Sequence, residues 1–284
     1  MLRKVIQIAG KTYVISLPSS WLKKYGIKKG DSLEVQEKGS YLVVAPEKEL
    51  GEEMLRIDVS GVTHIKRILG AVYKAGYDAV RIDYSSKEER KAIDETLSMS
   101  LKTFHVMEEK DGSIIIKNLS EMRIEEFEQM LRRMFLLIIN NIEDAVKGIE
   151  GKDEEILEEV ISRDLEINNC ADFCRRSLNR KGYALFIKTP PLYFIVEQLE
   201  KIGDAIRDIA IENEKSKIDL YKRAAAITRN FYELYYGFDI MKFDIWISNI
   251  EELKKDLAKD ESSLKLLVEE LYSMNGALLV CKLG

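Results

Sequence analysis

The segment Glu197–Asp208, EQLEKIGDAIRD, combines four acidic residues and one glycine in a stretch with helical periodicity. At about 100° per residue, with Glu200 taken as zero, Asp204 falls at about 40°, Glu197 at about 60° and Asp208 at about 80°. The four carboxylates therefore share one narrow stripe of a helix. The isoleucines and leucines of the same segment lie on the opposite face and are expected to pack in a core.

The negative stripe has two interpretations. Like charges four residues apart on a helix repel each other by about a few tenths of a kcal/mol per pair. Lys201 and Arg207 offset this repulsion only in part. The stripe is therefore either a mildly unfavourable solvated face or a place where a cation binds.

Helical periodicity continues on both sides of this segment, from Glu121 to the end of the chain. Pro190 and Pro191 stand where a helix begins, because proline fits the first turn. The pattern predicts six antiparallel helices in two groups of three, an all-α bundle. The expected helices span residues 124–149, 153–182, 190–213, 217–236, 240–258 and 262–282.

Residues 49–120 alternate between strand and helix patterns and predict a small α/β sandwich. Strands are expected at 54–59 and 79–83, helices at 63–75 and 87–101, and a hairpin that turns at 110–112. No glycine-rich phosphate loop follows either of the first two strands. A connector or dimerisation module is therefore favoured over a ligand pocket.

Residues 1–48 predict four short strands and one short helix that follows Pro18. A unit of this size buries little core and usually needs a partner chain. It carries nine lysines and arginines against four acidic residues, whereas the rest of the chain is net negative. A basic segment on an acidic chain favours an anionic partner for that segment.

The whole chain has 284 residues, of which 46% are hydrophobic and 33% charged, enough for packed cores. These patterns predict a multidomain α+β protein with domains at 1–48, 49–120 and 121–284. The first residues lack the apolar region of a signal peptide, and the apolar runs are too short to insert in a membrane. We expect a cytoplasmic protein whose three cysteines are buried and reduced.

The run LPSSWLKKYGIKKGDSLEV, residues 17–35, resembles the AbrB/MazE/SpoVT swapped-hairpin DNA-binding domain. The resemblance implies a homodimer in which two chains interlock into one β barrel and a basic surface contacts DNA. By position, Arg3, Lys4 and Lys11 are the DNA-binding candidates. Ser16 stands where relatives often have an arginine, which favours phosphate contacts over base reading. Alternatively, these basic residues only keep a dimerisation module soluble.

The run LEKIGD, residues 199–204, together with RDLEIN, residues 163–168, resembles the PhoU family. In that family the Glu/Asp-x-x-x-Asp motif binds metal clusters, typically iron or zinc. The resemblance implies a metal site here, and Gly203 is expected to allow the close approach of a neighbouring helix. The predicted metal ligands are Glu200, Asp204, Asp208, Glu197 and Asp164.

The family motif is expected twice, but the second group of helices departs from it. In VEELYSMNGALLV, residues 268–280, Glu269 and Glu270 are followed four residues later by Ser273 and Met274. A second acidic site is therefore predicted to be lost. The solvated acidic face remains the alternative for the first one.

The combination of the two resemblances is similar to archaeal proteins described as phosphate-uptake regulators. It implies binding to DNA and to the ATPase subunit of a phosphate ABC transporter or a sensor protein. One alternative is a protein-binding regulator that is only dimerised by its N-terminal domain. A metal-dependent hydrolase is disfavoured, because no histidine or nucleophile accompanies the acids, so no enzyme is expected.

Overall fold

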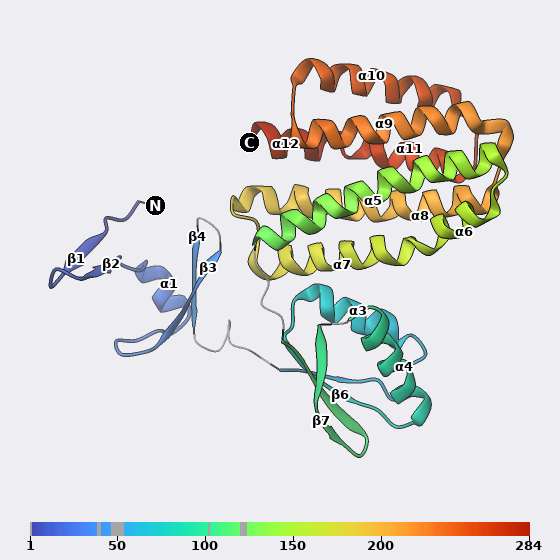
Figure 1. The fold of residues 1–284 in the computed structure, drawn as a ribbon. Helices are drawn as coiled ribbons and strands as arrows, with labels where there is room; N and C mark the ends of the chain where they lie inside the picture. Colours follow the sequence, from blue (N-terminus) through green and yellow to red (C-terminus); the bar gives the residue numbers. More distant parts are fainter. Residues whose placement is uncertain (1, 39–40, 47–53, 102, 120–123) are drawn as a thin grey trace.

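The computed structural model describes residues 2–38, 41–46, 54–101, 103–119 and 124–284, arranged as three parts along the chain (Figure 1). The predicted domain boundaries at 48/49 and 120/121 lie outside the described residues. The expected elements are present in all three parts, and the differences concern how they are joined.

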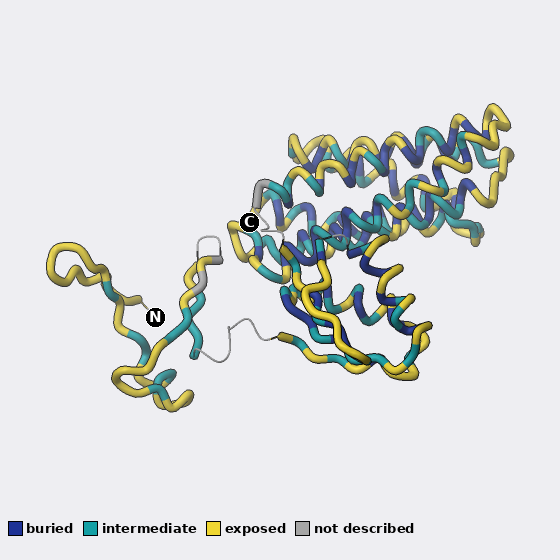
Figure 2. The backbone as a smooth tube through the Cα atoms, turned by 60° about the horizontal axis from the view of Figure 1, so that its bottom comes forward, coloured by how far each residue is buried: buried dark blue, intermediate teal, exposed yellow. Residues whose placement is uncertain are grey.

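The N-terminal part forms two separate two-stranded antiparallel sheets. Its elements are β1 (Ile6–Ile8), β2 (Thr12–Val14), α1 (Ser19–Lys24), β3 (Leu33–Lys38) and β4 (Tyr41–Pro46). The predicted barrel is not closed among the described residues, because β1–β2 and β3–β4 do not share a sheet. Figure 2 shows that this part is mostly exposed, in contrast to the helical part. The described residues of this part therefore form two hairpins and no closed core.

The middle part is a four-stranded sheet in the order β5-β6-β8-β7, with α3 and α4 on one face (Figure 1). β5 and β6 are parallel, and the other two pairings are antiparallel. The core of this part is separate from that of the helices. The elements are β5 (Leu55–Asp58), α3 (Ile65–Ala75), β6 (Ala79–Asp83), α4 (Lys87–Met99), β7 (Phe104–Lys110) and β8 (Ser113–Asn118).

The helical part has the six predicted rods, two of which are broken. The second rod breaks at Arg163 and the sixth at Met274, so eight α-helices are described. α8 starts with the two prolines, as predicted, and contacts α5, α6, α7, α11 and α12. The helices are α5 (Ile124–Gly151), α6 (Glu154–Ser162), α7 (Asp164–Lys181), α8 (Thr189–Glu212), α9 (Ile218–Tyr236), α10 (Ile240–Asp256), α11 (Ser263–Ser273) and α12 (Asn275–Leu283).

Two further expectations concern the chain as a whole. Cys170, Cys174 and Cys281 are free and buried, which confirms their expected burial. Over the part of the chain that the structure describes, no helix combines the length and apolar character needed to cross a membrane.

Candidate functional site

The predicted metal ligands lie where α7 packs against α8, and Gly203 makes this packing close. A Cβ atom built on Gly203 would lie 2.9 Å from Cγ2 of Ile167 on α7. Real Cβ atoms essentially never make so short a contact, so the Ile167 side chain lies against the backbone of α8 as closely as only glycine permits. The predicted role of Gly203 is confirmed, and the acidic stripe of α8 faces residues from α7.

The first group of carboxylates surrounds Arg175 of α7, and we call it the Arg175 cluster. The guanidinium donates from Nη1 to Asp172 Oδ1 at 3.0 Å and from Nη2 to Glu200 Oε2 at 3.1 Å. Its Nε forms an ion pair with Glu197. The Arg175 side chain is only 3% exposed, so it is an internal group between the two helices. Asp172 also pairs with Lys74 of α3 at 3.6 Å.

The second group surrounds Arg207 of α8, and we call it the Arg207 cluster. Nη1 donates to Asp204 Oδ1 at 2.6 Å and to Asp164 Oδ2 at 3.2 Å. Nε donates to Asp208 Oδ1 at 3.0 Å. Asp164 is the first residue of α7, so this guanidinium also joins α7 to α8. All five predicted ligands thus lie where α7 packs against α8, but they form two groups, each around an arginine.

Burial has a clear effect on two of these carboxyl groups. Burial, the largest effect, raises the pKa of Glu200, and the charge of Arg175 opposes the shift. Burial likewise raises the pKa of Asp164, which Arg207 opposes and the nearby Asp204 reinforces. Carboxylates so placed need compensating positive charge, because an unpaired buried ion is strongly unfavourable.

The two clusters offer few free oxygen atoms to a metal ion. Oδ1 of Asp164 and Oδ1 of Asn168 are buried acceptors without a hydrogen-bond donor. Two oxygens are fewer than the four ligands that zinc takes in protein sites. The described residues contain no group of three or more His, Cys, Asp or Glu side chains that could hold a metal ion. As arranged here, the residues do not fit a metal, and the metal assignment stays a prediction.

The equivalent place in the second group of helices is also neutralised from within the chain. Gln198 of α8 donates from Nε2 to Glu270 and, at 2.6 Å, to Oγ of Ser273. Lys201 lies 3.5 Å from the other oxygen of Glu270. Lys201 is one of the two basic residues of the segment 197–208, and its ammonium group balances an acid of α11.

The three predicted DNA-binding residues are exposed but lie apart along one hairpin. Arg3 and Lys4 precede β1, and Lys11 stands at the turn at the other end of that strand. Further exposed lysines at 23–24 and 28–29 flank the turn after α1. Sequence reasoning did not select them, although the two Lys-Lys pairs beside Gly26 were a visible signal. The N-terminal part therefore exposes more basic side chains than the three predicted.

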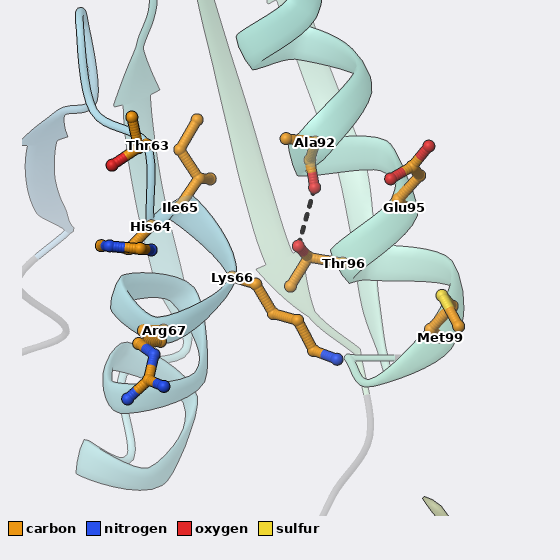
Figure 3. Close-up of a pocket in the computed structure, with 9 residues that line it drawn as sticks. All are labelled: Thr63, His64, Ile65, Lys66, Arg67, Ala92, Glu95, Thr96 and Met99. Carbon is orange, nitrogen blue, oxygen red and sulfur yellow. Dashed lines mark hydrogen bonds between the residues drawn. The ribbon is translucent and has the colours of Figure 1, made fainter.

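The middle part has a groove of about 400 Å³ between the start of α3 and one side of α4. In Figure 3, Lys66 extends toward α4, whereas His64 points to the opposite side. Thr96, at the wall of the groove, donates its hydroxyl to Ala92 O at 2.7 Å. The polar side chains contributed by α3 are exposed, so the groove is an open surface depression.

The carboxyl edge of the parallel strands β5 and β6 is closed by Glu89. Ligands of α/β proteins usually bind at such an edge. Glu89 is 9% exposed and accepts hydrogen bonds from the backbone N–H of Gly61 at 2.6 Å, Ser85 at 2.7 Å and Ser86 at 3.1 Å. A carboxylate of the chain itself therefore fills the place where an anion would bind.

Comparisons with known proteins locate two families in the chain. Residues 6–51 match the family described as antidote-toxin recognition MazE, bacterial antitoxin, and residues 131–212 match the PhoU domain. The second match contains both arginine clusters. The curated proteins gave no match. The phosphate transport system regulatory protein PhoU from Streptococcus pneumoniae is a similar solved structure, with 15% sequence identity and a TM-score of 0.45. That likeness covers 57% of this chain and 96% of the other. The chain therefore joins a MazE-type domain at its N-terminus to a PhoU domain, the two resemblances found in residues 17–35 and 199–204.

Proposed function

We propose that this chain regulates phosphate uptake by coupling a PhoU-type helical part to a DNA-binding N-terminal domain. The observation that carries the proposal is the presence of both domain types in one chain. In this proposal the helical part binds the ATPase subunit of a phosphate ABC transporter or a sensor protein in the cytoplasm. Binding of that partner then alters how the N-terminal domain binds DNA.

Dimerisation through the N-terminal part is supported by its exposed apolar side chains. Ile6 and Ile8 of β1 are more than half exposed, and Tyr13 of β2 is 69% exposed. Two-stranded sheets with uncovered apolar residues are unstable alone and pair with further strands. A second copy of the chain would cover these residues and close the barrel that one chain leaves open.

DNA binding is supported by the charge of this part. Arg3, Lys4, Lys11 and the two lysine pairs are exposed in a segment with an excess of positive charge. Contacts of this type are made to phosphates and release counterions, so the affinity falls as salt rises. The proposal therefore predicts weakly sequence-specific binding with a steep salt dependence.

The test is a titration of duplex DNA with the full chain between about 50 mM and about 200 mM salt. Replacing Arg3, Lys4 and Lys11 together by glutamine is expected to reduce the slope of log affinity against log salt by about 2 to 3 per chain, that is by about 5 for the dimer. A matched control replaces three exposed lysines of the helical part, Lys242, Lys255 and Lys259, and should leave the slope unchanged. Absence of binding at the lowest salt would remove the DNA-binding part of the proposal.

The second candidate is a regulator that does not bind DNA and is only dimerised by the N-terminal part. The observation that favours it is the separation of Arg3 and Lys4 from Lys11 along the β1–β2 hairpin. Light scattering of the purified chain alone, with the transporter ATPase subunit and with duplex DNA distinguishes the two candidates. A dimer that captures the subunit but ignores DNA supports this second function.

We also infer that the acidic face is not an active site. Every carboxylate of the two clusters contacts a guanidinium, so none is placed as a free general base. Turnover of phosphoesters that is lost in Asp204→Asn would overturn this inference.

A further inference from the structure

We propose that Arg175 and Arg207 take the charge-balancing place of metal ions in this chain, so that α7 and α8 pack without a metal. The PhoU resemblance implies a metal on the acidic stripe, whereas the described residues place a guanidinium within each group of carboxylates. The inference concerns the pairing of two helices and holds whether or not the chain binds DNA.

The geometry of the Arg175 cluster is that of a bridging cation. The arginine belongs to α7, and two of its three carboxylates, Glu197 and Glu200, belong to α8. A metal ion would hold the same acids by binding oxygens from both helices at once. A guanidinium has five N–H donors in a rigid fork and is charged at every physiological pH, so it performs this task without an ion.

Arg175 is buried between α7 and α8, so the packing of these helices fixes where its guanidinium lies. Its side chain is 3% exposed, unlike that of Arg207, which is 30% exposed. A metal that bound Glu197 and Glu200 would have to displace this guanidinium or lie beside it. Like charges at such short distances repel strongly in a poorly hydrated place. The buried arginine therefore excludes a cation from the Arg175 cluster.

The Arg207 cluster repeats the arrangement with the arginine on the other helix. Arg207 is on α8, and it reaches Asp164 on α7 as well as Asp204 and Asp208 on its own helix. The carboxylates raise the pKa of Arg207 although burial opposes this, so the guanidinium stays charged. Two arginines, one from each helix, thus connect α7 and α8 on either side of Gly203.

The first experiment uses the full chain, purified without chelators. Elemental analysis is expected to find far less than one iron or zinc per chain. Excess EDTA is expected to leave the thermal midpoint unchanged. A stoichiometric metal whose removal lowers the midpoint would overturn the proposal.

The second experiment removes the guanidinium groups one at a time. Arg175→Met and Arg207→Met leave each set of three carboxylates without its guanidinium, and among the described residues only Asp172 keeps a cation nearby, Lys74 at 3.6 Å. Both variants are expected to unfold at lower temperature than the parent. Zn²⁺ or Mn²⁺ should raise the midpoint of the variants but not that of the parent. Isothermal titration should show cation binding to the variants alone.

A matched control and a rescue keep the result interpretable. Arg229→Met removes an exposed arginine that pairs with Glu143, and it should neither change the midpoint strongly nor create a metal response. If Arg175→Met does not fold, the triple variant Arg175→Met/Glu197→Gln/Glu200→Gln removes the uncompensated charge and should restore folding without metal. Arginine variants with the parental midpoint and no response to Zn²⁺ would contradict the charge-balancing role.

Discussion

Arg176 of α7 forms an ion pair with Asp78, the residue before β6, at 2.7 Å, and this pair joins the helical part to the middle part. The Arg176 side chain has no exposed surface. Its guanidinium lies over the rings of Tyr73 and Phe104, with 4.9 Å and 5.4 Å to the ring centroids. It also donates to the carbonyl oxygen of Tyr73 at 2.8 Å. One buried arginine therefore satisfies two acceptors of the middle part.

Replacing Arg176 by methionine is expected to lower the free energy of unfolding by about 2 to 3 kcal/mol, because the charged hydrogen bonds of a fully buried guanidinium are lost. Arg180 also pairs with Asp78 but is 33% exposed. Arg180→Met should therefore lower the free energy of unfolding by less than about 1 kcal/mol. Urea denaturation of both variants measures the difference. Equal losses would show that burial does not distinguish the two arginines.

Gly203→Ala is expected to destabilise the chain, although alanine favours helix by about 1 kcal/mol. The new Cβ would lie 2.9 Å from Ile167, and overpacking of this kind costs about 1 to 3 kcal/mol. Gly276→Ala in α12 is the matched control, since a Cβ there meets no atom within 4 Å. The control should be neutral or slightly stabilising in thermal unfolding. A Gly203 variant as stable as that control would show that α7 and α8 can separate freely.

Glu89 predicts a pH dependence of stability. The backbone N–H groups of Ser85 and Gly61 hold the pKa of Glu89 below its usual value of 4.5. The folded state therefore binds this proton less readily than the unfolded state, and the stabilisation is complete above about pH 4.5. It is lost as the pH falls through the lower pKa of the folded state. Glu89→Gln should lower the stability at pH 7 and weaken the decline in acid, measured by urea denaturation across pH. An unchanged pH profile would contradict this role.

Burial should also protect the cysteines from reagents. Burial raises the pKa of the Cys170 thiol to about 11 and that of Cys174 well above its usual value. Thiolate is the reactive form, so both are expected to react slowly. Ellman's reagent at pH 8 should label the native chain slowly and the urea-unfolded chain rapidly at all three cysteines. Rapid native labelling of more than one thiol would show that α7 opens in solution, since only Cys281 lies on another helix.

Periodicity and proline placement predicted the helical rods, because each rod shows its apolar face and its first turn in its own residues. The breaks at Arg163 and Met274 were not predictable, since the apolar pattern continues through both. At the first break, Arg163 donates to Asp144 of α5 at 2.5 Å, a contact between segments distant in sequence. The barrel is a different case, because the resemblance implies one that two chains form together, and the described residues of one chain supply only two separate hairpins.

The sequence predicted the acidic stripe as one face of a helix. Of the two arginines that balance its charge, however, only one lies in the same segment. Arg207 lies within the quoted segment, but it offsets more of the negative charge than expected, because it pairs with three carboxylates. Arg175 belongs to another helix, and no spacing in the sequence fixes how far α7 slides along α8. The close contact at Gly203 with Ile167 sets that register, and the register puts Arg175 beside Glu197 and Glu200.

Arg175 and Arg176 are consecutive residues of α7, and neighbouring side chains of a helix point about 100° apart. One is anchored in the carboxylates of α8, and the other is anchored in the sheet-and-helix part of the chain. A twist of α7 that loosened the first anchor would therefore pull on the second. A ligand that displaced Arg175 from its carboxylates would therefore also shift Arg176 against Asp78. The helical part and the middle part would then move together.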